Sequence, residues 1–194
     1  MKNSAADVTF ATELTQLISH LRAFARSLCG DATFADDLAQ DTVAKAWQCR
    51  DSFEAGTNMK AWTFMILRNQ FYSDRRRAWR WEGLDPEVAA KTLVATSDPT
   101  AGLYLDEVRR ALACLPETQR EALVLIGAGG LSYEEAAEIC GVAIGTVKSR
   151  VSRARDQLAV VLAEGSMITD GQPPSQALEG FEAEVASLRR QAAA

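Results

Sequence analysis

Aromatic rings and arginines alternate between Asp51 and Arg80, the part of the sequence with the clearest binding chemistry. Ring faces accept unstacked bases, and guanidinium groups follow a phosphate backbone, so this composition suits single-stranded nucleic acid. Most of these rings, Trp62 above all, also fit a hydrophobic core. The rings are Phe53, Trp62, Phe64, Phe71, Tyr72 and Trp79, and the cations are Arg68, Arg75, Arg76, Arg77 and Arg80.

A second binding surface is predicted between Leu131 and Arg155, where the pattern indicates a helix-turn-helix motif. Small and apolar residues let two helices cross closely, and Gly141 supplies the positive φ of the turn. The predicted inner residues are Ala136, Ala137, Ile139, Val147, Val151, Ala154 and Leu158. The polar residues of the second helix can enter a major groove; a merely solvated basic helix is the alternative, which the lack of acids after Gly145 disfavours.

The charge of the chain is unevenly distributed. The net charge is −5, yet residues 60–81 and 145–163 are two basic islands on an acidic background. Two separate phosphate-facing surfaces are therefore expected, and the acidic remainder should suppress non-specific DNA binding by the free protein.

Other chemistries find little support. The four cysteines, Cys29, Cys49, Cys114 and Cys140, form no CxxC pair, and the single histidine, His20, lies in an apolar helical pattern. We therefore expect no metal site, no cofactor and no catalytic set. The glycines at 127–130 superficially resemble a dinucleotide loop but lack the GxGxxG spacing. An enzymatic role is not expected.

The elements that must position these residues are helices, and the predicted fold is all-α with two small helical domains. Helices are expected at about 10–28, 33–50 and 59–81 in a first domain of residues 8–81. Others are expected at about 101–115, 116–126, 132–141 and 144–162 in a second domain of residues 101–163. An acidic, flexible linker with two Asp-Pro steps spans 82–100.

The tail, 164–194, carries an apolar stripe that predicts a short helix, either loosely docked or binding a partner or the chain itself. Its stripe consists of Leu178, Phe181, Val185 and Leu188. No apolar run approaches the roughly 20 residues of a membrane span, and no signal peptide is evident. We expect a cytoplasmic protein without membrane contact.

Together, the two motif sets resemble the extracytoplasmic-function (ECF) sigma factors of bacterial RNA polymerase over about residues 10–162. The segments ADDLAQDTVAKAW and DSF and the W-x6-N spacing from Trp62 to Asn69 resemble sigma region two. The segments LPETQREALVL and GTVKSRVSRAR resemble region four. Within that family, NMKAW, NQFYSDRRR and SYEEAAEICG are most similar to the EcfG-type general-stress-response members.

The resemblance implies roles for individual residues. One set would face the clamp helices of the polymerase β′ subunit: Asp36, Asp37, Leu38, Gln40 and Asp41. Another would capture the melted minus-ten element: Phe53, Asn58, Asn69, Tyr72, Arg75, Arg76 and Arg77. A third would read the minus-thirty-five element as duplex: Thr146, Lys148, Ser149, Arg150, Ser152 and Arg153. The family often carries a bulkier residue where this chain has Ser152.

The resemblance also implies partners. They are the polymerase core, including its β flap, promoter DNA and an anti-sigma protein of the NepR kind, which a response regulator captures in turn. Two alternatives stay open. The chain could be a sigma-like decoy that binds the anti-sigma protein only, or a conventional dimeric helix-turn-helix regulator that needs no polymerase. The intact basic helix disfavours the decoy, because such a mimic does not need it.

Overall fold

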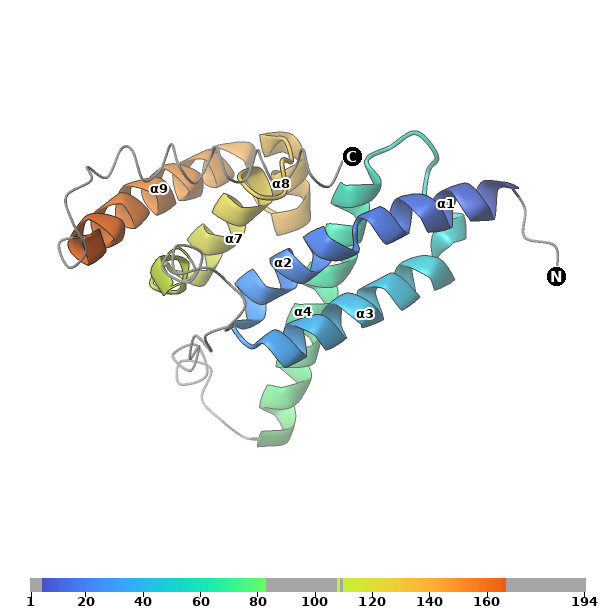
Figure 1. Ribbon diagram of the computed structural model, residues 1–194, viewed down its shortest axis with the longest axis horizontal. Coiled ribbons are helices and arrows are strands. Elements are labelled where there is room, and N and C mark those ends of the chain that lie inside the picture. The colour runs from blue at the N-terminus through green and yellow to red at the C-terminus, as the bar shows by residue number, and fades with distance from the viewer. Residues whose placement is uncertain (1–4, 83–107, 109, 167–194) are drawn as a thin grey trace. The chain divides into compact units, whose positions relative to one another are not determined.

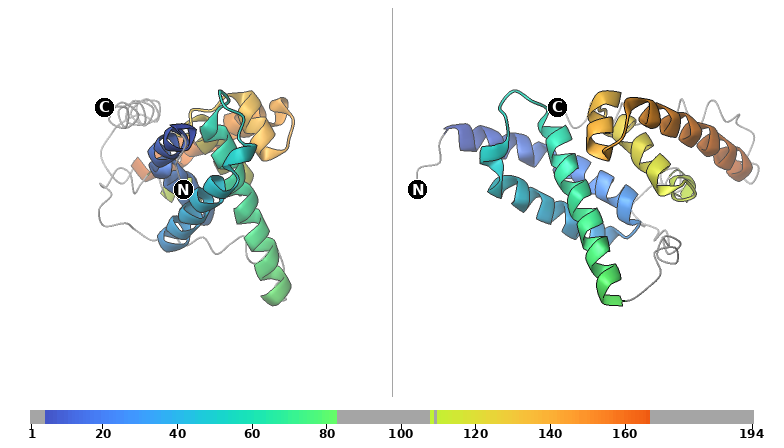
Figure 2. Two further views of the ribbon diagram at one scale, coloured as in Figure 1. Left: turned by 90° about the vertical axis from the view of Figure 1, so that its right-hand side faces the viewer. Right: turned by 180° about the vertical axis from the view of Figure 1, so that it is seen from behind.

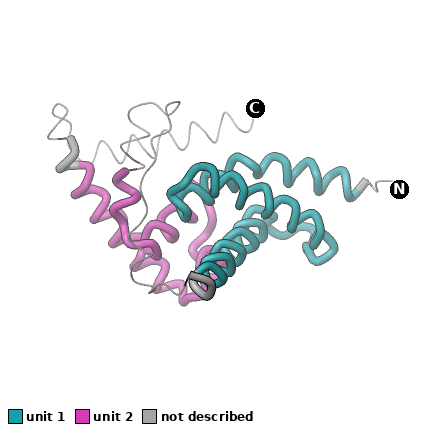
Figure 3. Tube along the Cα trace, turned by 90° about the horizontal axis from the view of Figure 1, so that it is seen from below, with its two compact units in different colours: residues 1–94 teal, residues 95–194 magenta. Residues whose placement is uncertain are grey.

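A computed structural model of the protein describes residues 5–82, 108 and 110–166 (Figure 1). Every regular element within those ranges is helical, so the predicted all-α fold is confirmed. The chain divides into two compact units, residues 1–94 and 95–194 (Figure 3), and each is described by itself. The division falls in the predicted linker, most of which lies outside the described residues, as does the predicted tail stripe.

The described part of the first unit contains four α-helices and one 3-10 turn. They are α1 (Ala5–Gln16), α2 (Ile18–Cys29), α3 (Ala32–Gln48), η1 (Arg50–Ser52) and α4 (Met59–Glu82). Helix α3 returns alongside α2, and α4 crosses this pair (Figure 2). Phe24 of α2 and Phe64 of α4 stack in the resulting core with ring centroids 4.7 Å apart. Burial of this apolar face holds the three helices together.

Local signals at the helix ends shape the turn between α2 and α3. Gly30 ends α2 with a φ of 74°, a left-handed conformation that a residue with a Cβ adopts at a cost. The carboxylate of Asp31 then accepts a hydrogen bond of 2.7 Å from the amide of Phe34 and caps α3. The turn between α2 and α3 is therefore fixed by two adjacent residues.

The single helix predicted at 10–28 is wrong, because the structure breaks it at Leu17. The amide of Leu17 donates to the carbonyl of Leu14 at 3.1 Å, a three-residue bond in place of the four-residue α-helical one. The break separates Leu14, which packs with Ala46 and Met59, from the residues of α2 that pack around Phe24. A break of one residue leaves the apolar spacing intact, so periodicity does not reveal it.

The second unit contains the predicted helix-turn-helix. Its described helices are α7 (Glu117–Ile126), α8 (Tyr133–Cys140) and α9 (Ile144–Ser166). Of the helix predicted at 101–115, only residues 108 and 110–115 are described, and 110–113 are helical. Helices α7 and α8 both pack on α9. The glycine break at 127–130 separates two helices and follows no strand within the described residues.

Helix α8 has a complete capping box. The Ser132 hydroxyl accepts from the amide of Glu135 at 3.1 Å, and the Glu135 carboxylate accepts from the amide of Ser132 at 2.7 Å. Gly141 ends the helix with a φ of 66°. Both ends of this short helix are therefore held by local signals, and Gly141 is the turn residue predicted from sequence.

Candidate nucleic-acid interfaces

The segment Arg50–Asn58 connects α3 to α4, and we call it the α3–α4 loop. Asn58 closes it, because its side-chain oxygen accepts from the amides of Lys60 at 3.1 Å and Ala61 at 3.3 Å and so caps α4. Gly56 has a φ of 92°, and Thr57 donates its hydroxyl to the carbonyl of Glu54 at 2.7 Å. The tip, residues 54–58, is exposed, and these hydrogen bonds hold part of it in place.

Phe53, predicted to contact bases, is half-buried among other rings. Its centroid lies 5.2 Å from that of Trp62 and 5.8 Å from that of Phe10. The core interpretation of Trp62 is confirmed, because the ring packs against the buried group of Leu14, Ala46 and Met59. Phe53 therefore fixes the base of the loop, and only part of its ring is accessible to a ligand.

Two other rings counted as stacking surfaces are unavailable. Phe64 is 1% exposed and Phe71 is 3% exposed, so for these two rings the core alternative is confirmed. Both lie on the face of α4 that packs into the three-helix core. Composition alone does not separate rings on the inner and outer faces of a helix.

A polar groove of about 530 Å³ lies between α3 and α4 and gathers part of the predicted minus-ten set. Asn69, Arg76 and Arg77 share this groove with Gln70 and Ser73. From α3 come Asp41, Ala44, Lys45, Gln48 and Cys49, and Asp74 completes the lining. The spacing of seven residues from Asn69 to Arg76 places both on one face of α4.

The other two members of that set on α4, Tyr72 and Arg75, do not line the groove. The Arg68 guanidinium is 4.7 Å from the centre of the Tyr72 ring, and that of Arg75 is 5.4 Å from the Phe71 ring. The groove thus gathers three of the five predicted residues of α4, while Phe53 and Asn58 belong to the loop.

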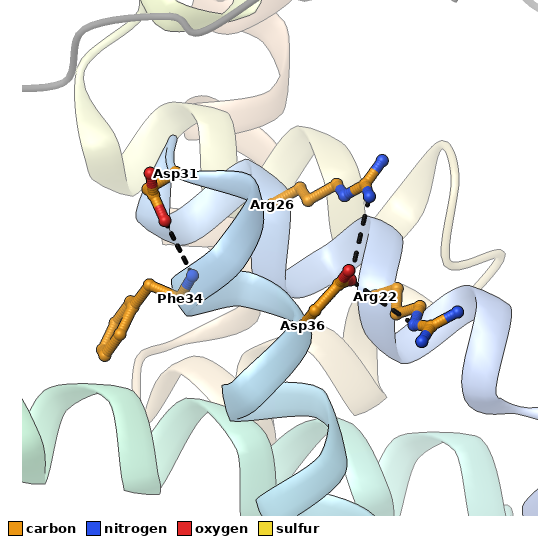
Figure 4. Close-up of polar contacts among 5 residues, drawn as sticks. All are labelled: Arg22, Arg26, Asp31, Phe34 and Asp36. Atoms are coloured by element: carbon orange, nitrogen blue, oxygen red, sulfur yellow. Dashed lines mark hydrogen bonds and ion pairs between the residues drawn. The ribbon is translucent and has the colours of Figure 1, made fainter. Parts of the chain in front are cut away.

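The predicted polymerase-facing residues of α3 are divided in the same way. Asp36 pairs with Arg22 at 3.4 Å and Arg26 at 3.7 Å, both on α2 (Figure 4). Leu38 is 3% exposed, so its side chain is not available to contact polymerase and that prediction is wrong. A helix cannot present positions 36, 37, 38, 40 and 41 on one face, and position 38 falls inward.

Three of these residues remain at the surface. Asp37, Gln40 and Asp41 are exposed, and the Asp41 carboxylate accepts from the Gln70 amide nitrogen at 3.3 Å. The last contact connects α3 to α4 beside the polar groove. The exposed part of the predicted acidic surface is therefore smaller than the sequence indicates.

The recognition surface of α9 has the division of faces predicted from sequence. Val147, Val151, Ala154 and Leu158 are at most 1% exposed. The outward residues are Lys148, Ser149, Ser152 and Arg153, with Thr146 and Arg150 half-buried beside them. The Lys148 ammonium lies 5.7 Å from the centre of the Tyr133 ring. A continuous polar face on a packed, capped motif is what major-groove entry requires.

Comparison with known proteins gives the same division of the chain. Residues 14–80 match the family model Sigma-70 region 2, and residues 105–158 match the model Sigma-70, region 4. The chain is 51% identical to the ECF RNA polymerase sigma factor EcfG of Rhodopseudomonas palustris (strain TIE-1) over 151 residues, 77% of this chain and 83% of that relative. This chain belongs to the ECF sigma factor family. Members are transcription initiation factors and not enzymes.

More distant relatives and solved structures agree with this sigma factor assignment. A probable RNA polymerase sigma-C factor of Mycobacterium bovis is 37% identical over 130 residues, 66% of this chain and 70% of that relative. The sigma factor RpoE of Bartonella quintana, solved in complex with the anti-sigma factor NepR, is 47% identical with a TM-score of 0.69, covering 80% of this chain and 97% of that one. CnrH, solved with the cytosolic domain of CnrY, is 29% identical with a TM-score of 0.58, covering 80% and 88%.

The structure of this sigma factor also adds residues that the sequence did not single out for function. Asp7 pairs with Arg50, the first residue of the α3–α4 loop. Tyr133 contacts Lys148 on the outward face of α9. Asp7 and Arg50 are 43 positions apart, so no local pattern connects them. Among the described helices, none combines the length and apolar character needed to cross a bilayer.

Proposed function

We propose that this sigma factor directs RNA polymerase to stress-response promoters by reading the minus-thirty-five element as duplex and capturing one strand of the minus-ten element. The main support for this proposal is the outer face of α9. Lys148, Ser149 and Arg153 are exposed there, whereas the apolar residues on the opposite face of the helix are buried. Lysine and arginine donors suit the acceptor edge of guanine, and serine suits either type of edge.

For the melted strand, the polar groove and the α3–α4 loop supply complementary chemistry. Arg76 and Arg77 can neutralise phosphates, and the Asn69 amide beside them can donate to and accept from a base edge. Extruding a base costs a few kcal/mol, which such contacts have to repay. The exposed loop tip, 54–58, lies at the beginning of α4, the helix that carries all three residues.

The partners in this proposal are the polymerase core, through Asp37, Gln40 and Asp41 and a β-flap contact of the second unit, and a NepR-like anti-sigma protein. The likeness to RpoE, solved in complex with NepR, supports the second partner. The proposed location is the cytoplasm, where the polymerase works.

The test is reconstituted transcription. Holoenzyme with the full-length chain selects promoters from a randomised duplex library, and run-off transcription from a selected promoter is then measured for Lys148→Ala, Arg153→Ala and Asn69→Ala. Each base contact should contribute about 1–3 kcal/mol of discrimination. The control is Gln157→Ala, an exposed change on α9 outside the proposed contacts.

The expected result is loss of promoter-specific transcription with unchanged affinity for core polymerase. Unchanged transcription in both α9 variants overturns the recognition-helix assignment. Failure of the wild-type chain to support transcription from any selected promoter, with tight binding to an anti-sigma protein, identifies a decoy instead.

A further inference from the structure

Helix α1 contacts the α3–α4 loop through a charged pair. The Arg50 guanidinium donates from Nε to Oδ1 of Asp7 at 3.0 Å. Arg50 also donates to the carbonyl of Trp47 at 3.1 Å, and its guanidinium lies 5.0 Å from the centre of the Trp47 ring. The first residue of the loop is therefore held by the end of α3 and by α1 together.

Phe10 makes the second contact between α1 and the loop. Its ring centroid lies 5.8 Å from that of Phe53 and 6.1 Å from those of Trp47 and Trp62. Aromatic pairs at such distances contribute beyond simple burial, and the edge-to-face geometry of the pairs with Phe53 and Trp62 restricts the orientation of the Phe10 ring. Phe10 is thus the ring that joins the end of α3, the base of the loop and the first turns of α4.

The aromatic group continues into the buried core. Phe10, Phe53 and Trp62 pack against Leu14, Ala46 and Met59. Met59 is the first residue of α4, so both ends of the loop are tied to the same group of side chains. The tip, 54–58, is exposed to solvent.

We propose that α1 positions the α3–α4 loop for binding to the minus-ten element. Phe10 and Asp7 are then positioning residues that influence discrimination between minus-ten sequences without touching DNA. The inference rests on the proposed function of the α3–α4 loop. Both residues precede the range 14–80 that matches the family model. The contacts that α1 makes with the α3–α4 loop therefore come from a segment outside that model. A loop already fixed in its binding conformation loses less entropy when a base enters, which favours tight and selective capture.

The experiment uses holoenzyme assembled from core polymerase and the full-length chain. The probe is forked promoter DNA with either the preferred or a substituted minus-ten element, and the readout is the ratio of the two affinities. Phe10→Ala should lower this ratio about tenfold, and Phe10→Tyr should restore most of it because the ring is kept. Asp7→Lys should lower it about twofold, and adding Arg50→Glu should restore it.

Matched measurements separate positioning from general damage. Val8→Ala alters a 54% exposed residue of the same helix and should change nothing. Affinity for core polymerase and discrimination at the minus-thirty-five element should stay at the wild-type value in every variant. A melting curve identifies any variant that fails to fold, in which case Phe10→Leu and the charge-swapped pair carry the test.

The outcomes distinguish this inference from the proposed function. If Asn69→Ala abolishes minus-ten discrimination while Phe10→Ala, Phe10→Leu and Asp7→Lys retain the full ratio, the positioning role of α1 is overturned and the function stands. If the wild-type holoenzyme shows no minus-ten discrimination, the function proposed for the loop fails and the inference fails with it. Equal loss at both promoter elements also overturns the inference, because it indicates a general effect on the chain and not a local effect on the α3–α4 loop.

Discussion

The ammonium group of Lys148 lies 5.7 Å from the centre of the Tyr133 ring and so connects the first residue of α8 to an outward position of α9. A cation over an aromatic face at an exposed site contributes about 0.5–1 kcal/mol. This contribution is small compared with the stabilisation from the buried contacts between the two helices. The main consequence is therefore the orientation of a long, flexible side chain that is proposed to read DNA.

The first prediction is that Tyr133→Ala weakens minus-thirty-five binding about two- to fivefold, as expected from losing about 0.5–1 kcal/mol of orientation. Tyr133→Phe should bind like the wild type because the ring face is kept. Holoenzyme affinity for duplex promoter DNA is the measurement. An equal effect of Tyr133→Ala in the presence and absence of Lys148→Ala would show that the two residues act independently.

The second prediction concerns the capping box of α8. Ser132→Ala removes the acceptor for the Glu135 amide and should destabilise the second unit by about 1 kcal/mol. All four tryptophans, Trp47, Trp62, Trp79 and Trp81, belong to residues 1–94. In urea unfolding followed by far-ultraviolet circular dichroism, the part of the transition that belongs to the second unit should therefore move to lower urea. The transition followed by tryptophan fluorescence, which reports the first unit, should be unchanged. A shift in the fluorescence transition contradicts the assignment.

Local sequence signals predicted the second unit well, because its determinants are close together in the chain. The cap at Ser132, the end at Gly141 and the buried stripe of α9 each depend on residues within one or two helical turns. In the first unit, the break at Leu17 preserves the apolar spacing and stays invisible to periodicity. The Asp7–Arg50 pair joins positions 43 apart, which no local pattern can reveal.

The site residues, too, were predictable only where a local pattern determines the position of the side chain. The outward positions of α9 were predictable because a single period of 3.6 residues assigns each side chain to a face. The polymerase-facing role that the family resemblance implied for Leu38 does not fit its buried side chain, and composition alone left Phe64 and Phe71 open between core and stacking roles. The helical period of α3 and α4 is what marks these residues as inward.

The third prediction concerns Cys29. Burial, with a smaller contribution from the negative charge of Asp31, raises the pKa of the Cys29 thiol from 9.0 to about 12. A rise of this size lowers the thiolate population at pH 8 by about a thousandfold relative to an ordinary thiol. Because the thiolate is the reactive form, iodoacetamide should modify the exposed Cys49 and Cys114 long before Cys29 in the folded protein. Mass spectrometry of peptides gives the order, and early labelling of Cys29 would contradict it.

The same shift gives the fourth prediction, a pH dependence of stability. The folded state keeps the Cys29 proton to higher pH than the unfolded state does, so this contribution is fully present below about pH 9. It should be lost as the pH rises from about 9 to about 12. Cys29→Ser or Cys29→Ala should remove this component of the alkaline decline in the free energy of unfolding of the first unit. Tryptophan fluorescence in urea measures it, and an identical decline in wild type and variants would exclude the thiol as its source.

The last prediction separates two neighbouring acids of α3. Asp36 pairs with Arg22 and Arg26 on α2, whereas Asp37 is exposed on the outer face. We expect Asp36→Asn to act on the fold, lowering the free energy of unfolding by less than about 1 kcal/mol, because the carboxylate is 34% exposed and the two arginines more so. The loss should shrink as salt is added, since salt screens the pair.

Asp37→Asn should leave the unfolding transition unchanged and weaken binding to core polymerase, with a smaller difference from wild type at high salt. The two substitutions are isosteric and adjacent, so each is the matched control for the other. Titration of core polymerase with each full-length variant, beside urea unfolding of the free chain, measures both quantities. If Asp36→Asn causes the larger loss of polymerase affinity, the Asp36 carboxylate leaves its arginine partners when polymerase binds, and the α2–α3 ion pairs belong to the free state only.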